Sequence, residues 1–108
     1  MWNQKCHQFL GLAMRAGKVV SGEATVLAGA KNHKVKLVLL ATDVAKNNQK
    51  KVTDKCATYN VPFLQVATTD EQSLAIGKAN RVVIGITDAG FAKGLKERLT
   101  KVEETNEN

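Results

Sequence analysis

Several residue types on which enzyme sites and secreted scaffolds depend are scarce in this sequence. Among its 108 residues there are two cysteines, two histidines and one proline. Cys6 and Cys56 lack the close, paired spacing of a zinc site, and each lies on the apolar face of a predicted helix. We therefore interpret both as reduced thiols of the core, and we expect no metal and no cofactor.

The sequence also lacks a long apolar run. No stretch approaches the roughly 18 apolar residues of a membrane-spanning helix, and no basic segment followed by an apolar one indicates a signal peptide. The composition is nevertheless 44% hydrophobic, which is sufficient for one compact domain of this length. We expect a cytoplasmic protein without membrane contact, with a single domain over residues 1–102 and a disordered acidic tail over residues 103–108.

Catalytic groupings are missing as well. His7 lies on the first predicted helix and His33 in a basic loop, and neither has a serine, cysteine or carboxylate at a spacing that would form a dyad. Asp43 and Asp88 each follow a predicted strand, but each directly precedes a helical pattern, so we interpret both as N-caps. The sequence therefore predicts a protein that is not an enzyme.

Negative charge is scarce in the first half of the chain. Residues 1–60 contain ten Lys or Arg and three acidic residues, whereas residues 61–108 contain six and seven. The net charge of +6 is therefore concentrated in the first half. A polyanion such as RNA is the natural partner of such a surface, because each cation that replaces a counterion on a phosphate backbone adds affinity. A basic surface that serves only solubility is the alternative.

Apolar periodicity predicts helices and strands in alternation. Helical patterns cover residues 3–16, a segment around Val26 and Ala30, residues 45–59 and 71–76, and a last helix after Asp88; strand patterns cover residues 19–20, 37–42, 62–67 and 82–86. Thr69, with Gln72 three residues later, predicts a capping box. This alternation predicts an α/β fold, a three-layer α/β/α sandwich with a four-stranded mixed central sheet.

The stretch from Gly17 to Asp43 is the strongest candidate for a binding site. Its short strand leads into Ser21 and Gly22 and then into a helix. The free backbone N–H groups at residues 21–23 and the positive end of the helix dipole favour a phosphate there. Four lysines are predicted to surround this helix start: Lys18, Lys31, Lys34 and Lys36.

Three segments together resemble a known family. They read GLAMRAGKVVSGEATVLAGAKNHKVKLVLLATDV, TDKCATYNVPFLQV and LAIGKANRVVIGITDAGFAKGL. As a set they are similar to the bacterial YlxQ-type branch of the ribosomal L-seven-Ae superfamily, which binds kink-turn RNA. The resemblance implies an α/β/α sandwich that docks on a kink-turn, an RNA bend made by a short bulge beside tandem sheared G·A pairs. It also implies partners among kink-turn or ribosomal RNA, the ribosome and translation factors.

The resemblance further implies which residues contact RNA. In that family the start of the second helix enters the opened groove at the G·A pairs, and a hydrophobic loop before the last strand covers the bulged nucleotides. A-form grooves are too narrow for side chains to read, so such proteins recognise RNA that is already bent or unstacked. Together with the candidates from the stretch Gly17 to Asp43, the predicted RNA-binding residues are Lys18, Ser21, Gly22, Glu23, Ala24, Thr25, Ala28, Lys31, Ile76, Lys78, Ala79, Asn80, Arg81 and Val82.

The sequence departs from the family at its polar positions. Counting back from the KLVLL strand, the family's base-reading Asn-Glu pair falls at Ala24 and Thr25, and its phosphate-binding lysine and arginine fall at Ala28 and Asn32. A good base contact discriminates by about 1–3 kcal/mol, so these replacements lower the expected affinity unless other cations, such as Arg81, compensate.

Two functions of different classes remain open from the sequence. The first is a non-enzymatic, monomeric protein that binds kinked or structured RNA in ribosome- or translation-related complexes, and the basic first half and the Gly22 turn favour it. The second is a protein-interaction module of the translation or transcription machinery with weak or generic RNA affinity. The small side chains at Ala24 and Ala28 favour the second.

Overall fold

Two short apolar runs form the centre of the sheet. The computed structural model describes the backbone of residues 2–107 and the side chains of residues 2–99. Strands β2 (Leu37–Leu40) and β4 (Val83–Ile86) are buried along their whole length, as expected for central strands. The shorter strands β1 (Val19–Ser21) and β3 (Phe63–Leu64) lie at the two edges.

The strand pairing is mixed, as the sequence predicted. β4 lies between β1 and β2 and runs antiparallel to both, whereas β3 pairs parallel with β2. Leu40 stands opposite Val83 and Leu37 stands opposite Ile86, so the sheet has a Val83 end and an Ile86 end. The candidate residues divide between these two ends.

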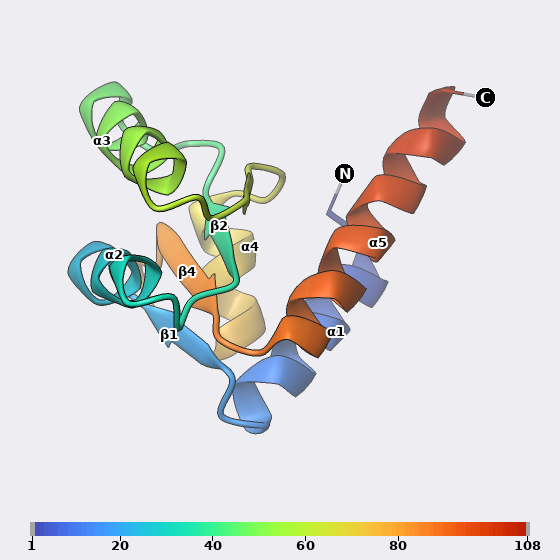
Figure 1. The fold of residues 1–108 in the computed structure, drawn as a ribbon. Helices are drawn as coiled ribbons and strands as arrows, with labels where there is room; N and C mark the ends of the chain where they lie inside the picture. Colours follow the sequence, from blue (N-terminus) through green and yellow to red (C-terminus); the bar gives the residue numbers. More distant parts are fainter. Residues whose placement is uncertain (1, 108) are drawn as a thin grey trace.

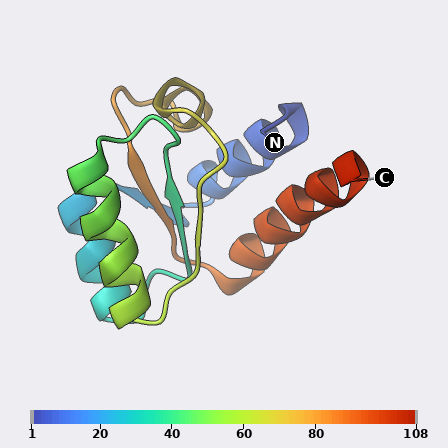
Figure 2. The ribbon, with the colours of Figure 1, turned by 90° about the horizontal axis from the view of Figure 1, so that it is seen from above.

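Helices cover both faces of this sheet. Helices α2 (Glu23–Lys31) and α3 (Lys46–Thr58) pack on one face, and α1 (Gln4–Arg15), α4 (Thr69–Ile76) and α5 (Ala89–Glu107) pack on the other (Figure 1, Figure 2). Alternate residues of β2 point to opposite faces, so Leu37 and Leu39 join one core and Val38 and Leu40 join the other. The predicted three-layer sandwich is confirmed.

The two cysteines lie in these different cores. Cys6 is buried on the α1 side of the sheet and Cys56 on the α3 side, and both are free. Burial raises the pKa of the Cys56 thiol, which lowers its thiolate fraction and its reactivity. The interpretation of both residues as core thiols is confirmed.

The caps of three helices show where local patterns were right and wrong. Asp88 caps α5 as predicted, because its carboxylate accepts a hydrogen bond of 2.9 Å from the Phe91 N–H. Asp43 does not cap α3, whose N-cap is Ala45; its carboxylate instead accepts two hydrogen bonds from Thr69. That tertiary contact shifts the capping box of α4 by one residue, from the predicted Thr69 to Thr68 with Glu71.

Two elements differ in length from the predictions. The outer strand predicted over residues 62–67 is shortened to β3, because the Gln65 side chain, rather than a backbone N–H, donates to the Ala41 carbonyl at 3.2 Å. At the other end of the chain, α5 continues through residues 103–107, where the sequence predicted a disordered tail.

Candidate nucleic-acid interface

The turn between β1 and α2 places a helix start at the Val83 end of the sheet. Gly22 is the N-cap of α2 at φ +96°, a conformation that L side chains rarely adopt, and no side chain caps this helix. The Gly22 N–H donates to the Val83 carbonyl at 3.0 Å, so it is not free, contrary to the prediction. The first backbone bond within α2 is donated by Val26. The N–H groups without an intrahelical acceptor are therefore those of Glu23, Ala24 and Thr25.

The segment from residue 77 to residue 82 forms the second part of the site. Gly77, at φ +71°, ends α4, and Asn80 also has a left-handed backbone, at φ +56°. Two buried polar side chains of α4 hold this loop. The Gln72 amide donates to the Arg81 and Val82 carbonyls at 3.1 and 3.2 Å, and the Ser73 hydroxyl accepts from the Arg81 N–H at 2.8 Å.

These two segments, almost sixty residues apart in sequence, meet at Arg81. A Cβ at Gly22 would lie 3.9 Å from a terminal guanidinium nitrogen of Arg81. The Arg81 Nε is buried and has no hydrogen-bond partner among the described residues. The guanidinium therefore stands beside the open start of α2, where its charge adds to the dipole of the helix. We call residues 22–25 together with residues 77–82 the turn-and-loop surface.

A second cation, Lys51, lies beside the start of α2. The Lys51 ammonium of α3 lies 2.8 Å from the Glu23 carboxylate, whose side chain is 28% exposed. This ion pair offsets the charge of the acidic residue closest to the free N–H groups and links the first turn of α2 to α3. An anion that approached this turn would meet less repulsion from Glu23 than if this carboxylate were unpaired.

The four lysines predicted to surround the helix start do not lie there. Val19 pairs with Ile86, and the Lys36 N–H donates to the Ile86 carbonyl, so Lys18 and Lys36 are at the Ile86 end of the sheet. Lys31 is the last residue of α2, about 12 Å along the helix from Glu23 at 1.5 Å per residue. Lys34 lies in the connection between them. The prediction was wrong because α2 runs back along β1, which carries its end away from its start.

The remaining predicted residues divide by exposure. Ser21, in β1, and Val82 are half-buried, and Ile76 is only 5% exposed and belongs to the core beside α1. The Ile76 side chain is thus not available at the surface. The residues exposed on or next to the turn-and-loop surface are Ala24, Thr25, Ala28, Lys78, Ala79 and Asn80.

Three residues that organise this surface were missed in the sequence. Gln72 was assigned to a capping box, and neither Ser73 nor Lys51 was among the predicted site residues. A signal for Gln72 was present, since it lies four residues before the buried Ile76 and hence on the same face of α4. A polar side chain on a buried face needs a hydrogen-bond partner, and a loop backbone is the common one.

The described residues contain no arrangement suited to metal chemistry or to a membrane span. No group of three or more His, Cys, Asp or Glu in the described part of the chain is placed to hold a metal ion. Within the same residues, none of the helices combines the length and apolarity needed to cross a bilayer.

The fold and the site define a class, an α/β/α sandwich with a mixed sheet that presents a helix start and a loop at one end. Residues 4–97 match the sequence profile of the ribosomal protein L7Ae/L30e/S12e/Gadd45 family, and the chain belongs to this family. It is 51% identical over 86 residues to the RNA-binding protein YlxQ of Bacillus subtilis, covering 80% of this chain and 86% of that protein. It is 46% identical over 94 residues to the YlxQ of Enterococcus faecium, covering 87% and 90%.

Solved structures show the same fold. A Bacillus halodurans protein described as of unknown function superposes with a TM-score of 0.84 at 40% identity, over 88% of this chain and 96% of that one. The Giardia lamblia 15.5kD RNA binding protein superposes with a TM-score of 0.73 at 17% identity, over 96% and 92%. At that identity the second likeness concerns the fold alone.

Proposed function

We propose that the protein is a non-enzymatic, monomeric RNA-binding protein that recognises kinked RNA in cytoplasmic complexes of the ribosome or of translation. Membership of the L7Ae family and relatives named RNA-binding protein YlxQ support RNA as the partner. The single observation that carries the proposal is the meeting of the α2 start with Arg81 across the turn-and-loop surface.

The chemistry of this surface suits a bent phosphate backbone. Three backbone N–H groups at residues 23–25 and the positive end of α2 would face one phosphate, as in other anion sites at helix starts. The Arg81 guanidinium would add a charged, planar donor group beside them, able to bond a phosphate or a guanine edge bidentately. Lys78 and Asn80, both exposed, would contact the nucleotides at the loop.

The small residues on α2 determine which groups of this surface would contact RNA. Ala24 and Ala28 are exposed and offer no polar side chain where the family implies Asn and Lys. The polar contacts would therefore come from Thr25, from the backbone and from Arg81. Glycine is required by the backbone conformation at residue 22, and because it has no side chain, RNA would be able to approach the chain closely at this turn.

The same alanines favour a second candidate function. An exposed α2 surface without polar side chains at two positions suits contact with a protein. In that case the molecule would be an interaction module of the translation or transcription machinery, and its RNA affinity would be weak and generic.

One titration separates the two. We would measure binding to a labelled kink-turn RNA and to the same RNA with its two G·A pairs changed to Watson–Crick pairs, at two salt concentrations. The proposal expects tight binding that depends on the G·A pairs. Equal, weak and steeply salt-dependent binding to both RNAs would instead indicate generic phosphate contact and would favour the second candidate.

A matched pair of variants locates the contact. Arg81→Ala and Lys34→Ala each remove one positive charge, at opposite ends of the sheet. We expect Arg81→Ala to weaken kink-turn binding by about tenfold, equal to about 1.4 kcal/mol, and Lys34→Ala to change it far less. Equal effects of the two variants would contradict a site at the turn-and-loop surface.

A further inference from the structure

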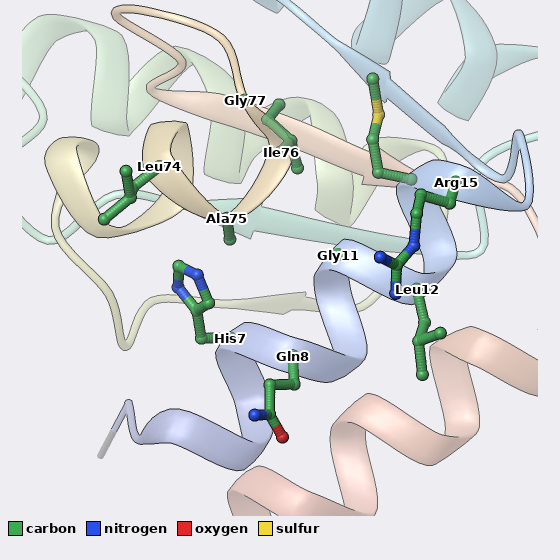
Figure 3. Close-up of a pocket in the computed structure, with 10 residues that line it drawn as sticks. His7, Gln8, Gly11, Leu12, Arg15, Leu74, Ala75, Ile76 and Gly77 are labelled. Carbon is green, nitrogen blue, oxygen red and sulfur yellow. The ribbon is translucent and has the colours of Figure 1, made fainter.

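A groove between α1 and α4 adjoins the turn-and-loop surface and shares Gly77 with it. It has a volume of about 710 Å³ and runs along α1 from His7 to Arg15, with residues 74–77 on its other side (Figure 3). Small-molecule sites span about 300–1,000 Å³, so this groove has the size of a ligand site. The two helices come close together at Gly11, where a Cβ would lie 3.4 Å from the Ala75 carbonyl oxygen.

The lining combines planar and apolar side chains. His7 projects from α1 toward Leu74 and Ala75, and the Arg15 side chain lies beside Leu12 (Figure 3). Leu12 is 49% exposed and Leu74 is 75% exposed, so two of the large apolar residues exposed in the described chain belong to this one groove. Imidazole and guanidinium planes stack on unpaired RNA bases, and aliphatic side chains contact the same faces.

The charge around the groove favours a polyanion. Helix α1 carries two basic residues and no acidic one. The acidic residues of α4 are both in its first turn, and the Glu71 carboxylate is occupied in the capping box. At the other end of α4, Gly77 lines the groove and leads directly into the loop that carries Lys78 and Arg81. The groove is therefore continuous with the basic, RNA-facing loop.

We infer that this groove holds unpaired nucleotides of the RNA strand that continues from the nucleotides bound at the turn-and-loop surface. The inference rests on the proposed function. The groove extends about 12 Å from His7 to Arg15 along α1, and stacked bases repeat at about 3.4 Å, so a few nucleotides match its length. The bound RNA thus extends beyond the kink, and the groove selects kinks whose bulged strand is long enough to enter it.

The test compares RNAs that differ only in this strand. One probe is a kink-turn RNA with its short bulge, the second has the bulge lengthened by a run of uridines, and a third carries the same uridines at the end of a stem. We expect the wild type to bind the second RNA at least about fivefold more tightly than the first and the third, because stacking on a protein surface adds affinity for each base.

Two variants examine the groove itself. Leu74→Glu places a negative charge on the rim and Arg15→Ala removes the cation, and both positions are exposed, so the fold is preserved. The control Ala57→Glu adds one negative charge at an exposed position of α3, in the opposite layer. We expect the two groove variants to lose the gain in affinity from the longer bulge but to bind the short-bulge RNA as tightly as the wild type does. The control should match the wild type on both RNAs.

The outcomes separate this inference from the proposed function. No gain from the longer bulge in the wild type, or a gain that survives in Leu74→Glu and Arg15→Ala, would overturn the inference and leave the groove to a protein partner. RNA binding that did not depend on the G·A pairs would overturn kink-turn recognition. The groove-dependent gain in affinity from the longer bulge could still be observed in that case. A wild type that binds none of the RNAs would overturn both.

Discussion

The shape of the loop at residues 77–82 depends on the buried side chain of Gln72. Its side chain is 1% exposed, and its amide is the donor for the two successive carbonyls of Arg81 and Val82. Gln72→Leu keeps nearly the same volume, so the cavity cost is small. It removes both hydrogen bonds, each of which contributes a net ~1 kcal/mol, and the carbonyls lose their partner.

We expect Gln72→Leu to lower the free energy of unfolding by about 2 kcal/mol, which corresponds to a fall in Tm of roughly 8–16 °C for a domain of this size. Urea unfolding measures this change, and an unchanged m value would show that both proteins unfold in the same way. Kink-turn affinity should fall as well, because residues 77–82 would no longer be held in one arrangement.

The same substitution at Gln65 is a matched control. The Gln65 amide makes one hydrogen bond to a backbone carbonyl, at 3.2 Å, and its side chain is only partly buried. Gln65→Leu should cost about 1 kcal/mol or less and leave RNA affinity unchanged. If Gln72→Leu were within about 0.5 kcal/mol of the wild type, the range of ordinary surface substitutions, our account of how the loop is held would be refuted.

Two further predictions concern the backbone at Gly22 and the pH dependence of stability. Gly22→Ala should lower the free energy of unfolding, measured in urea, by about 1–3 kcal/mol, because alanine is strained at φ +96°. The control Gly11→Ala, within α1, should be close to neutral. Equal stabilities of the two variants would contradict the strain. Hydrogen bonds from the Thr69 hydroxyl and then from its N–H hold the pKa of Asp43 below its ordinary value. A carboxyl with a depressed pKa contributes stability above its unfolded pKa and loses it as pH falls through the folded value. The Tm of the wild type should therefore fall further than the Tm of Asp43→Asn as the pH is lowered from about 4. Parallel profiles of Tm against pH would show that the contact contributes nothing to stability.

Local patterns in the sequence were sufficient for most of the fold. The runs at residues 37–40 and 83–86 are apolar on both faces, which only a central strand satisfies, and the structure places both at the centre of the sheet. Asp88 was predicted as an N-cap because capping depends on backbone groups within a few residues. Such signals are local and hence readable in one sequence.

Contacts between distant segments were not readable in this way. Asp43 fits the N-cap pattern, but Thr69 offers its carboxylate two hydrogen bonds, and the cap moved to Ala45. The lysines near Gly22 in the sequence are far from it in space, whereas Lys51 and Arg81 are distant in sequence and close in space. The pairing of strands and the direction of α2 decide these distances, and no local pattern reports them.

The sequence by itself thus determined the class of fold, the family and the excess of positive charge, since periodicity, segment similarity and composition are properties of the chain alone. Only the tertiary structure decided which cation stands beside the start of α2, which buried polar groups hold the neighbouring loop, and that a groove opens between α1 and α4. The physical reason is that these features depend on how side chains from separate elements pack together, and packing is specified by the whole chain at once.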